Sequence, residues 1–121
     1  MPSGAKQVVL CSGKVYFDAA DKRNEASRMD IALVRLEQLY PFPRKALLEE
    51  LAKHPEAKVV WMQEEPRNQG AWQFVQDRLQ LLGVQASYLG RPIAASPAPG
   101  SYPRHRAEMD QLLDRMLQRR S

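Results

Sequence analysis

At the centre of the chain stands Trp61-Met62-Gln63-Glu64-Glu65-Pro66-Arg67-Asn68-Gln69-Gly70-Ala71-Trp72. An apolar run precedes it and a helical pattern follows it, which predicts a strand, a polar turn and a helix. Two adjacent carboxylates, a proline, amides and a glycine are concentrated in the turn. A solvated loop does not need so many specific polar groups between two tryptophans, so we expect a functional or docking edge here.

Apolar runs and helical patterns alternate along the rest of the chain. The first two runs are continuous, which is typical of parallel strands that are covered on both faces. The predicted strands are residues 7–11, 31–36, 58–63 and 84–89, and the predicted helices are residues 14–28, 43–53, 72–82 and 109–117. This order predicts a three-layer α/β/α domain with a four-stranded, mainly parallel sheet in the order 2-1-3-4.

Two segments lie outside this pattern. Residues 1–6 are small and polar, and we expect them to be disordered or artificial, whereas residues 7–121 should form one domain. Residues 90–103 contain four prolines, which predicts a long irregular segment. Within the first helix we expect Tyr16, Phe17 and Ala20 to form the apolar face.

Composition and charge exclude several classes of function. A length of 121 residues fits one globular domain, and no apolar run is long enough for a membrane span. The net charge of +4 allows acidic partners, although solvated lysines and arginines are the simpler interpretation. Arg104-His105-Arg106 lacks the interleaved aromatics of nucleic-acid binding, so we expect neither nucleic acid nor a membrane as partner. Cys11 is the only cysteine, which excludes an internal disulfide and suits a reducing compartment.

The predicted strand order brings two polar turns together. Ligands of open α/β sheets bind at the carboxyl ends of the strands where the winding reverses, here between the first and third strands. Ser12-Gly13-Lys14 and residues 63–70 follow these two strands, so both turns should face one crevice. A helix start attracts anions by only about 0.3–1 kcal/mol. An anion site would therefore also need Arg35, Arg67 or Arg91, and the first turn is not a phosphate loop.

The acidic and amide side chains of the central stretch do not complete a catalytic arrangement. Glu64 and Glu65 point to opposite faces if both lie in a strand, so they do not form an acid–base pair across one substrate. One of them is expected to accept backbone amides or to bind an arginine. Asn68 and Gln69 either cap the following helix or contact a partner.

The histidines and the cysteine do not indicate a metal or a nucleophile. Neither His54 nor His105 has a neighbour at metal-ligand spacing, so we predict no metal, and His54 should be solvated beside its helix end. Cys11 ends a buried strand and is expected to be an inert thiol. On its residues alone, the chain is predicted to be a binding, docking or assembly domain without catalytic residues.

Ordered motifs across residues 7–117 carry a family resemblance. They are Cys11-Ser12-Gly13-Lys14-Val15-Tyr16-Phe17-Asp18, then Glu37-Gln38-Leu39-Tyr40-Pro41-Phe42-Pro43, then Gln63-Glu64-Glu65-Pro66 with Asn68-Gln69-Gly70-Ala71-Trp72, then Gly90-Arg91-Pro92 and Ala95-Ser96-Pro97-Ala98. The chain resembles the transketolase-type C-terminal domain of the decarboxylating component of 2-oxoglutarate dehydrogenases, which depend on thiamine diphosphate.

The resemblance implies a role within a larger enzyme. That family decarboxylates 2-oxoglutarate oxidatively in the tricarboxylic acid cycle and transfers the succinyl group to a lipoyl arm of its dihydrolipoyl succinyltransferase partner. Thiamine diphosphate and magnesium are bound by upstream domains, and the Gly-Asp-Gly motif for that cofactor is missing here. The fragment should therefore bind no cofactor and be inactive alone, while it supports the homodimer and the packing of the upstream domains.

The resemblance also suggests a location and a set of contact residues. The expected location is the bacterial cytoplasm, or the mitochondrial matrix in a eukaryote. Candidates for domain packing or an effector site are Ser12, Gly13, Lys14, Arg35, Gln63, Glu64, Glu65, Asn68, Gln69, Gly70, Trp72 and Arg91. The alternative function is an independent regulatory module that binds an anion such as a nucleotide or acyl-CoA.

Overall fold

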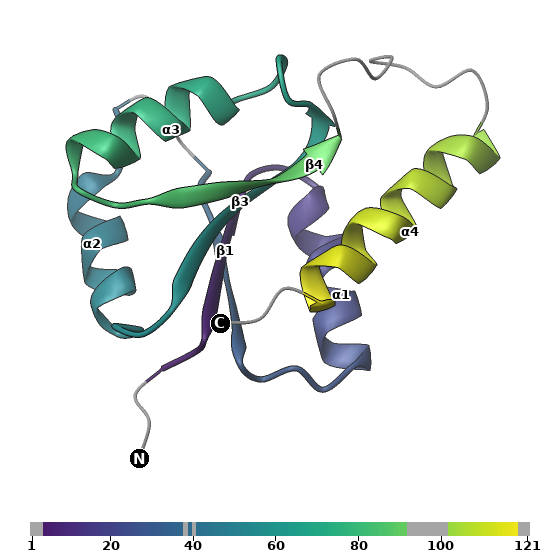
Figure 1. Cartoon of the computed structure of the whole chain (residues 1–121), viewed down its shortest axis with the longest axis horizontal. Coiled ribbons are helices and arrows are strands. Elements are labelled where there is room, and N and C mark those ends of the chain that lie inside the picture. The colour runs from purple at the N-terminus through teal and green to yellow at the C-terminus, as the bar shows by residue number, and fades with distance from the viewer. Residues whose placement is uncertain (1–3, 38, 40, 92–101, 119–121) are drawn as a thin grey trace.

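A computed structural model describes residues 4–37, 39, 41–91 and 102–118 of the chain. Strands and helices alternate along it (Figure 1), in the order β1 (Gln7–Cys11), α1 (Val15–Glu25), β2 (Ile31–Arg35), α2 (Arg44–Ala52), β3 (Lys58–Pro66), α3 (Trp72–Leu81), β4 (Ala86–Arg91) and α4 (Tyr102–Gln118). None of the helices in this part of the chain has the length and apolar composition that a membrane crossing requires.

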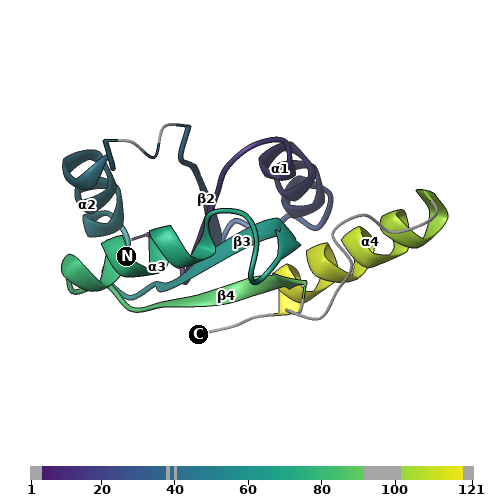
Figure 2. The same ribbon diagram turned by 90° about the horizontal axis from the view of Figure 1, so that it is seen from above.

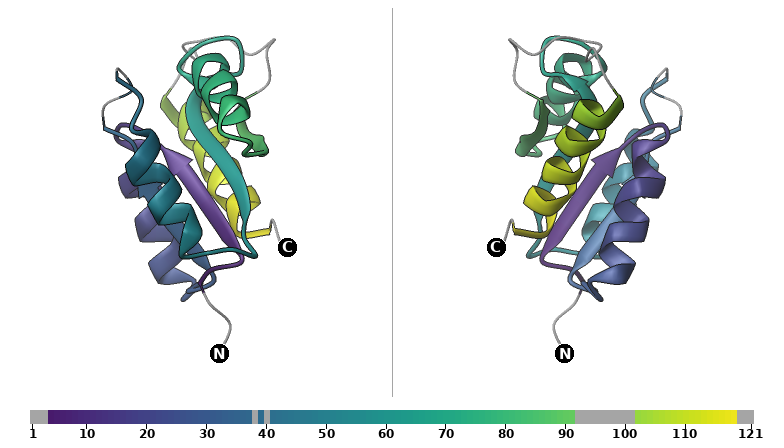
Figure 3. Two further views of the ribbon diagram at one scale, coloured as in Figure 1. Left: turned by 90° about the vertical axis from the view of Figure 1, so that its left-hand side faces the viewer. Right: turned by 90° about the vertical axis from the view of Figure 1, so that its right-hand side faces the viewer.

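The sheet has the order β2-β1-β3-β4, and every neighbouring pair of strands is parallel. α1 and α4 cover one face and α2 and α3 cover the other (Figures 2 and 3). The predicted strand order and three-layer architecture are therefore confirmed. The winding reverses between β1 and β3, because α1 leads to one side of β1 and α2 leads to the other.

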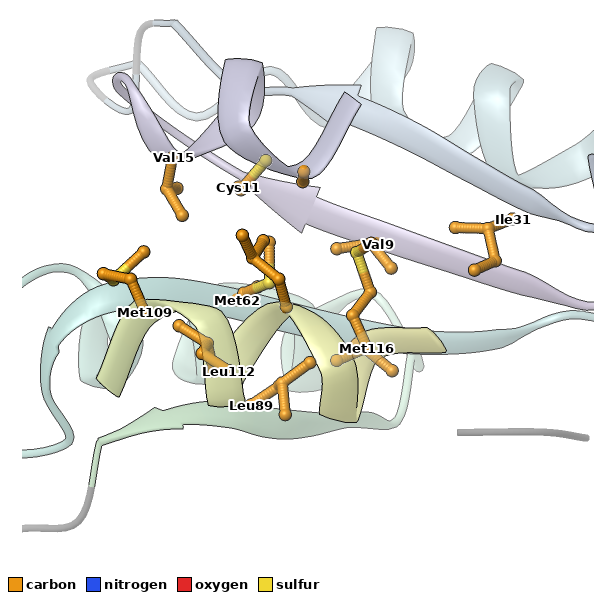
Figure 4. Close-up of a cluster of buried hydrophobic side chains, with 12 residues drawn as sticks. Val9, Cys11, Val15, Ile31, Met62, Leu89, Met109, Leu112 and Met116 are labelled. Atoms are coloured by element: carbon orange, nitrogen blue, oxygen red, sulfur yellow. The ribbon is translucent and has the colours of Figure 1, made fainter. Parts of the chain in front are cut away.

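Alternation along the strands divides the core into two clusters. Val8 and Leu10 of β1 pack toward α2 and α3, while Val9 and Cys11 pack toward α1 and α4 (Figure 4). All five residues of β1 are buried, as a central strand covered on both faces requires. The unbroken apolar run of this strand is the signal from which a parallel sheet could be predicted.

Several predicted boundaries and faces were wrong. β3 continues to Pro66, so Glu64 and Glu65, which were expected in the turn, lie in the strand, whereas residues 67–70 form the turn. β4 runs later than expected, to Arg91, and α4 begins at Tyr102 and α1 ends at Glu25. In α1 the buried residues are Val15 and Ala19, and Tyr16 packs against the core as predicted, whereas Phe17 is 52% exposed because it lies on the side of the helix opposite Val15 and Ala19. The predicted irregular segment falls mostly outside the described residues.

The carboxyl end of α4 is held against β1 and α1 by polar side chains that were not predicted from the sequence. The Gln7 side chain is buried and its Nε2 donates a hydrogen bond to the Met116 carbonyl, at 3.2 Å. Arg28 donates another to the Leu117 carbonyl. The last carbonyls of a helix have no partner within the helix, so these bonds satisfy groups that would otherwise need water. Lys22 of α1 adds an ion pair with Asp114, at 3.1 Å.

Asp30 should make stability depend on pH. Hydrogen bonding to Arg28, 2.8 Å from Nε to Oδ1, lowers the pKa of this carboxyl below its usual range. A lowered folded-state pKa stabilises the fold above the unfolded pKa, and the contribution is lost as pH falls through the folded pKa. We expect Asp30→Asn to cost at most about 1 kcal/mol at pH 7, because exposed ion pairs are weak.

Urea unfolding of the two proteins between pH 7 and pH 2 measures this effect. The stability difference between wild type and Asp30→Asn should shrink as the pH falls below about 4, where free aspartate titrates. Asp21→Asn is the matched control, because Asp21 is an exposed aspartate of α1. A difference between wild type and Asp30→Asn that does not change with pH would contradict the expectation.

Candidate functional site

The two polar turns lie where β1 and β3 part. The pairing of these strands ends at Leu10 and Trp61, and β3 continues beside β4 alone (Figure 1). A bulge follows, because the register advances from Met62 to Pro66 on β3 but only from Leu89 to Arg91 on β4. Bulges re-aim side chains and are common beside functional sites. This bulge contains Gln63 and both candidate glutamates.

Gln63 organises the turn from within. Its Oε1 accepts a hydrogen bond of 2.8 Å from the Trp61 indole Nε1, which is buried. Its Nε2 donates to two main-chain carbonyls, to that of Gln69 at 2.8 Å and to that of Glu65 at 3.1 Å. The side chain is only 3% exposed. Gln63 therefore fixes the 65–69 loop against the sheet and does not itself present a surface for contact.

Gly70 closes this loop and must be a glycine. Its φ is +68°, and a Cβ at this position would lie 3.0 Å from Glu65 Oε1 and 3.2 Å from Gln63 Nε2. Both the backbone conformation and the space therefore disfavour a side chain. The predicted capping role of Asn68 and Gln69 is wrong, because Ala71 is the N-cap of α3 and no side chain caps it. Both side chains are exposed instead.

Tyr88 completes the arrangement, although sequence reasoning missed it. Its hydroxyl donates to the Glu65 carbonyl at 3.3 Å, and its ring centroid lies 5.6 Å from that of Trp72. Arg67 stacks on the outer face of the same ring, 5.2 Å from its centroid. Burial raises the pKa of Tyr88, so the hydroxyl keeps its proton at neutral pH. The signal was the strand register, which places Tyr88 opposite Trp61.

The two carboxylates differ in their surroundings. Glu65 is exposed and its Oε1 approaches Gly70, while Glu64 is half-buried. Trp72, another candidate, is only 3% exposed and packs beneath the loop. Of the central stretch, Glu65, Arg67, Asn68 and Gln69 therefore form the accessible surface, which we call the outer loop.

The second group of candidates lies at the end of β1 and β2. Gly13 has a φ of +80° and Lys14 is exposed at the start of α1, where it makes no side-chain cap. Arg35 stands opposite Cys11 in the register, lies 4.7 Å from the Phe17 ring centroid and pairs with Glu37. The Arg35 guanidinium is thus already engaged by an aromatic ring and a carboxylate.

Two further candidates complete this edge of the sheet. Ser12 is half-buried in the turn after β1. The backbone of Arg91 pairs with Pro66, but its side chain lies outside the described residues. The structure therefore places the candidates in two groups along the carboxyl edge of the sheet, each with contacts inside its own turn.

His54 differs from its prediction. It was expected to be solvated, but its side chain is 14% exposed and its Nδ1 accepts a hydrogen bond of 2.8 Å from the Ala5 main-chain N–H. The residues before β1 fold back onto the end of α2, which brings a partner that is 49 positions away in sequence. No local pattern around His54 indicates such a contact.

Cys11 should be unreactive in the folded chain. The thiol is fully buried under α1, and burial raises its pKa to about 12, partly offset by the charge of Arg35. Because the thiolate is the reactive form, we expect a thiol reagent at pH 8 to modify Cys11 at the rate of unfolding. Following modification with a chromogenic disulfide in zero and in denaturing urea measures this. Rapid modification of the folded chain would contradict the buried placement.

The described residues do not fit a metal-bound diphosphate cofactor. No group of three or more His, Cys, Asp or Glu side chains within them is placed to hold a metal ion. The turn after β1 offers Ser12, Gly13 and Lys14 and lacks an acidic ligand. The carboxyl edge presents an exposed polar loop whose backbone is held by Gln63 and Tyr88.

Comparison with known proteins gives this edge its context. The family model described as 2-oxoglutarate dehydrogenase C-terminal matches residues 1–117. The chain belongs to that family. It is 49% identical over 116 residues to the 2-oxoglutarate dehydrogenase E1 component of Cupriavidus necator and 46% identical over 119 residues to that of Brucella anthropi. Each alignment covers 93% of the chain but only 12% of the relative, so the chain spans about an eighth of these proteins.

A solved structure supports the fold of this family domain. The structure described as "Split gene transketolase, inactive beta4 tetramer" superposes with a TM-score of 0.63 and covers 98% of this chain and 42% of its own. The sequence identity is 17%, so the likeness concerns the fold alone. The resemblance to a transketolase-type C-terminal domain of the 2-oxoglutarate dehydrogenase E1 component is thereby confirmed.

Proposed function

We propose that the chain acts as the C-terminal domain of a 2-oxoglutarate dehydrogenase E1 component, in which it supports dimer assembly and domain packing without catalysing a step itself. The observation that carries the proposal is the family match over residues 1–117. A role as one part of a larger enzyme is supported by the relative with 49% identity, of which the chain matches 12% of the length.

The outer loop is the proposed docking element. Gln63 and Tyr88 hold its backbone through the Glu65 and Gln69 carbonyls, so the main chain that carries its exposed side chains is fixed before any partner arrives. Pre-ordering lowers the conformational entropy lost on docking. Glu65, Asn68 and Gln69 offer a carboxylate and two amides at the carboxyl edge of the sheet. Their partner would be the upstream part of the same enzyme.

The larger enzyme defines the proposed chemistry and location. Oxidative decarboxylation of 2-oxoglutarate and succinyl transfer to the lipoyl groups of a dihydrolipoyl succinyltransferase would take place on other domains. Thiamine diphosphate and magnesium would be held there as well. The relatives described above are bacterial, which favours the cytoplasm of a bacterium as the location.

A chimera tests this role. The chain would replace the matching segment of the Cupriavidus necator E1 component, with which it shares 49% identity. We expect the chimera to decarboxylate 2-oxoglutarate at a rate within about threefold of the parent, since at this identity the packed core and edge should be reproduced. The isolated chain, supplied with thiamine diphosphate and magnesium, should show no turnover.

The controls of this assay separate docking from folding. Glu65→Ala with Gln69→Ala in the chimera removes outer-loop side chains, while Glu49→Ala with Lys45→Ala removes exposed side chains of α2. We expect only the first pair to lower turnover. Turnover by the isolated chain, or an inactive chimera that folds as well as the parent, would contradict the proposal.

The alternative is an independent module that binds nucleotides or acyl-CoA at the β1–α1 turn. It draws support from exposed Lys14 and from Arg35 stacked on Phe17 and Tyr16. An anion would first have to displace Glu37 from Arg35. Calorimetry of the isolated chain with ATP and with acetyl-CoA distinguishes the two functions, because only the independent module predicts heat of binding at millimolar ligand.

A further inference from the structure

Residues 4–6, which we call the leading segment, are held against the domain by three elements. The Ala5 N–H donates to His54 Nδ1 at 2.8 Å, and the Ala5 side chain is only 6% exposed. The Lys6 N–H donates to the Asp30 carbonyl at 2.8 Å, and the Lys6 carbonyl accepts from the Lys58 N–H at 3.0 Å. The segment thus extends β1 backward between the starts of β2 and β3.

The fit around Gly4 is close. Its φ is +84°, and a Cβ there would lie 2.2 Å from the Lys53 carbonyl oxygen and 2.5 Å from His54 Nδ1. A real Cβ does not approach a backbone oxygen this closely, so the leading segment can occupy its place only with glycine at this position. The end of α2 therefore accepts only a residue without a Cβ at position 4.

The hydrogen bond to His54 exists only while the imidazole is neutral. Nδ1 accepts from Ala5, so it carries no proton, and the proton of the neutral ring is on Nε2. Nε2 lies 3.5 Å from Glu50 Oε2. Protonation would place an N–H at Nδ1 against the N–H of Ala5, and the bond would be lost. The Glu50 carboxylate, in contrast, would hold the protonated ring.

We propose that His54 is a pH-sensitive latch, which holds the leading segment on the domain when neutral and releases it when protonated. Histidine is the side chain that ordinarily changes charge between pH 5 and 8. The charged residues on the elements packed around His54 are Glu50 and Lys53 of α2, which pair with each other, and Lys6 and Lys58, whose main chains are hydrogen-bonded to each other. Release would uncover the Lys58 N–H at the amino edge of the sheet, while the Asp30 carbonyl would keep its bond from the Gln7 N–H.

Amide hydrogen exchange followed by NMR tests the latch. Between pH 8 and pH 5.5, the protection factor of the Ala5 amide, corrected for intrinsic exchange, should fall about tenfold, as the loss of a hydrogen bond predicts. His54→Asn is the decisive control, because the Asn Oδ1 takes the place of Nδ1 and does not titrate. It should keep the amide protected at both pH values, and His54→Leu should leave it unprotected at both.

A second NMR experiment on the same protein identifies the tautomer of the neutral His54 ring. Long-range proton–nitrogen correlations at pH 8 should show His54 with its proton on Nε2. A wild-type protection factor that does not change with pH, or a fall of equal size in His54→Asn, would overturn the proposal. These outcomes are independent of the enzymatic role, because they are measured on the isolated chain.

A second variant opens the latch without a change of pH. Gly4→Ala should block docking of the leading segment, so trypsin should cleave after Lys6 about tenfold faster than in wild type at pH 8. Gly83→Ala is the matched control, because Gly83 also has a positive φ, +77°, but a Cβ there would meet nothing within 4 Å. Equal cleavage after Lys6 in the two variants would show that the leading segment is not held as described.

Discussion

Gln63→Leu is expected to destabilise the domain by about 2–3 kcal/mol. The leucine fills much of the same space but leaves the buried Trp61 indole N–H without its acceptor, and an unsatisfied buried donor costs about 1–3 kcal/mol. The Gln69 carbonyl also loses its donor from Gln63, whereas the Glu65 carbonyl keeps the Tyr88 hydroxyl. The 65–69 loop should therefore loosen while the sheet remains.

Urea unfolding followed by tryptophan fluorescence measures this change, since both tryptophans flank the site. Gln73→Leu is the matched control, because Gln73 is exposed on α3 and its bond to Asp77 is a surface contact. The control should change stability by less than about 0.5 kcal/mol. A loss in Gln63→Leu as small as that of the control would show that Gln63 does not organise the turn.

Met116→Ala is expected to cost about 2–5 kcal/mol, the range for large-to-small changes in a core. The Met116 side chain is fully buried between α4 and the sheet, where it meets Val9 and Leu89 (Figure 4). The variant leaves a cavity on the face that α4 covers. It keeps the main-chain carbonyl that accepts from Gln7, so the loss reports packing alone.

Thermal and urea unfolding of Met116→Ala should be compared with those of Gln111→Ala. Gln111 lies on the exposed side of the same helix, and alanine there favours the helix slightly. If the two variants were equally stable, α4 would not pack against the face of the sheet that it shares with α1. The sheet would then expose the face lined by Val9, Met62 and Leu89.

The sheet could be predicted from sequence because the patterns that indicate its strands lie within short stretches of the chain. The unbroken apolar run of β1 reports burial on both faces, and the order of elements restricts the topology. Phe17 was misplaced because the helical face was read from residue type, whereas Phe17 lies on the side of α1 opposite Val15 and Ala19 and contacts Arg35 there. The small residue Ala19 is the one that packs against the core.

The position of the candidate site could be predicted from sequence, but the contacts among its residues could not. The stretch around Gln63 was found because polar groups concentrate there, and the family motifs pointed to the same residues. The role of Gln63 depends on the bulge after Met62 and on the neighbouring Tyr88, which follow from strand register. His54 depends on a contact with Ala5 across 49 positions. Neither register nor a distant contact is encoded in a local pattern.

Sedimentation velocity of three proteins tests the supporting role most directly. They are the Cupriavidus necator E1 component, the same protein without its matching segment, and the chimera that carries this chain in that place. We expect the parent and the chimera to sediment as dimers at the same concentration, and the shortened protein to dissociate or aggregate. A shortened protein that forms the same dimer as the parent, with the same turnover, would contradict the account.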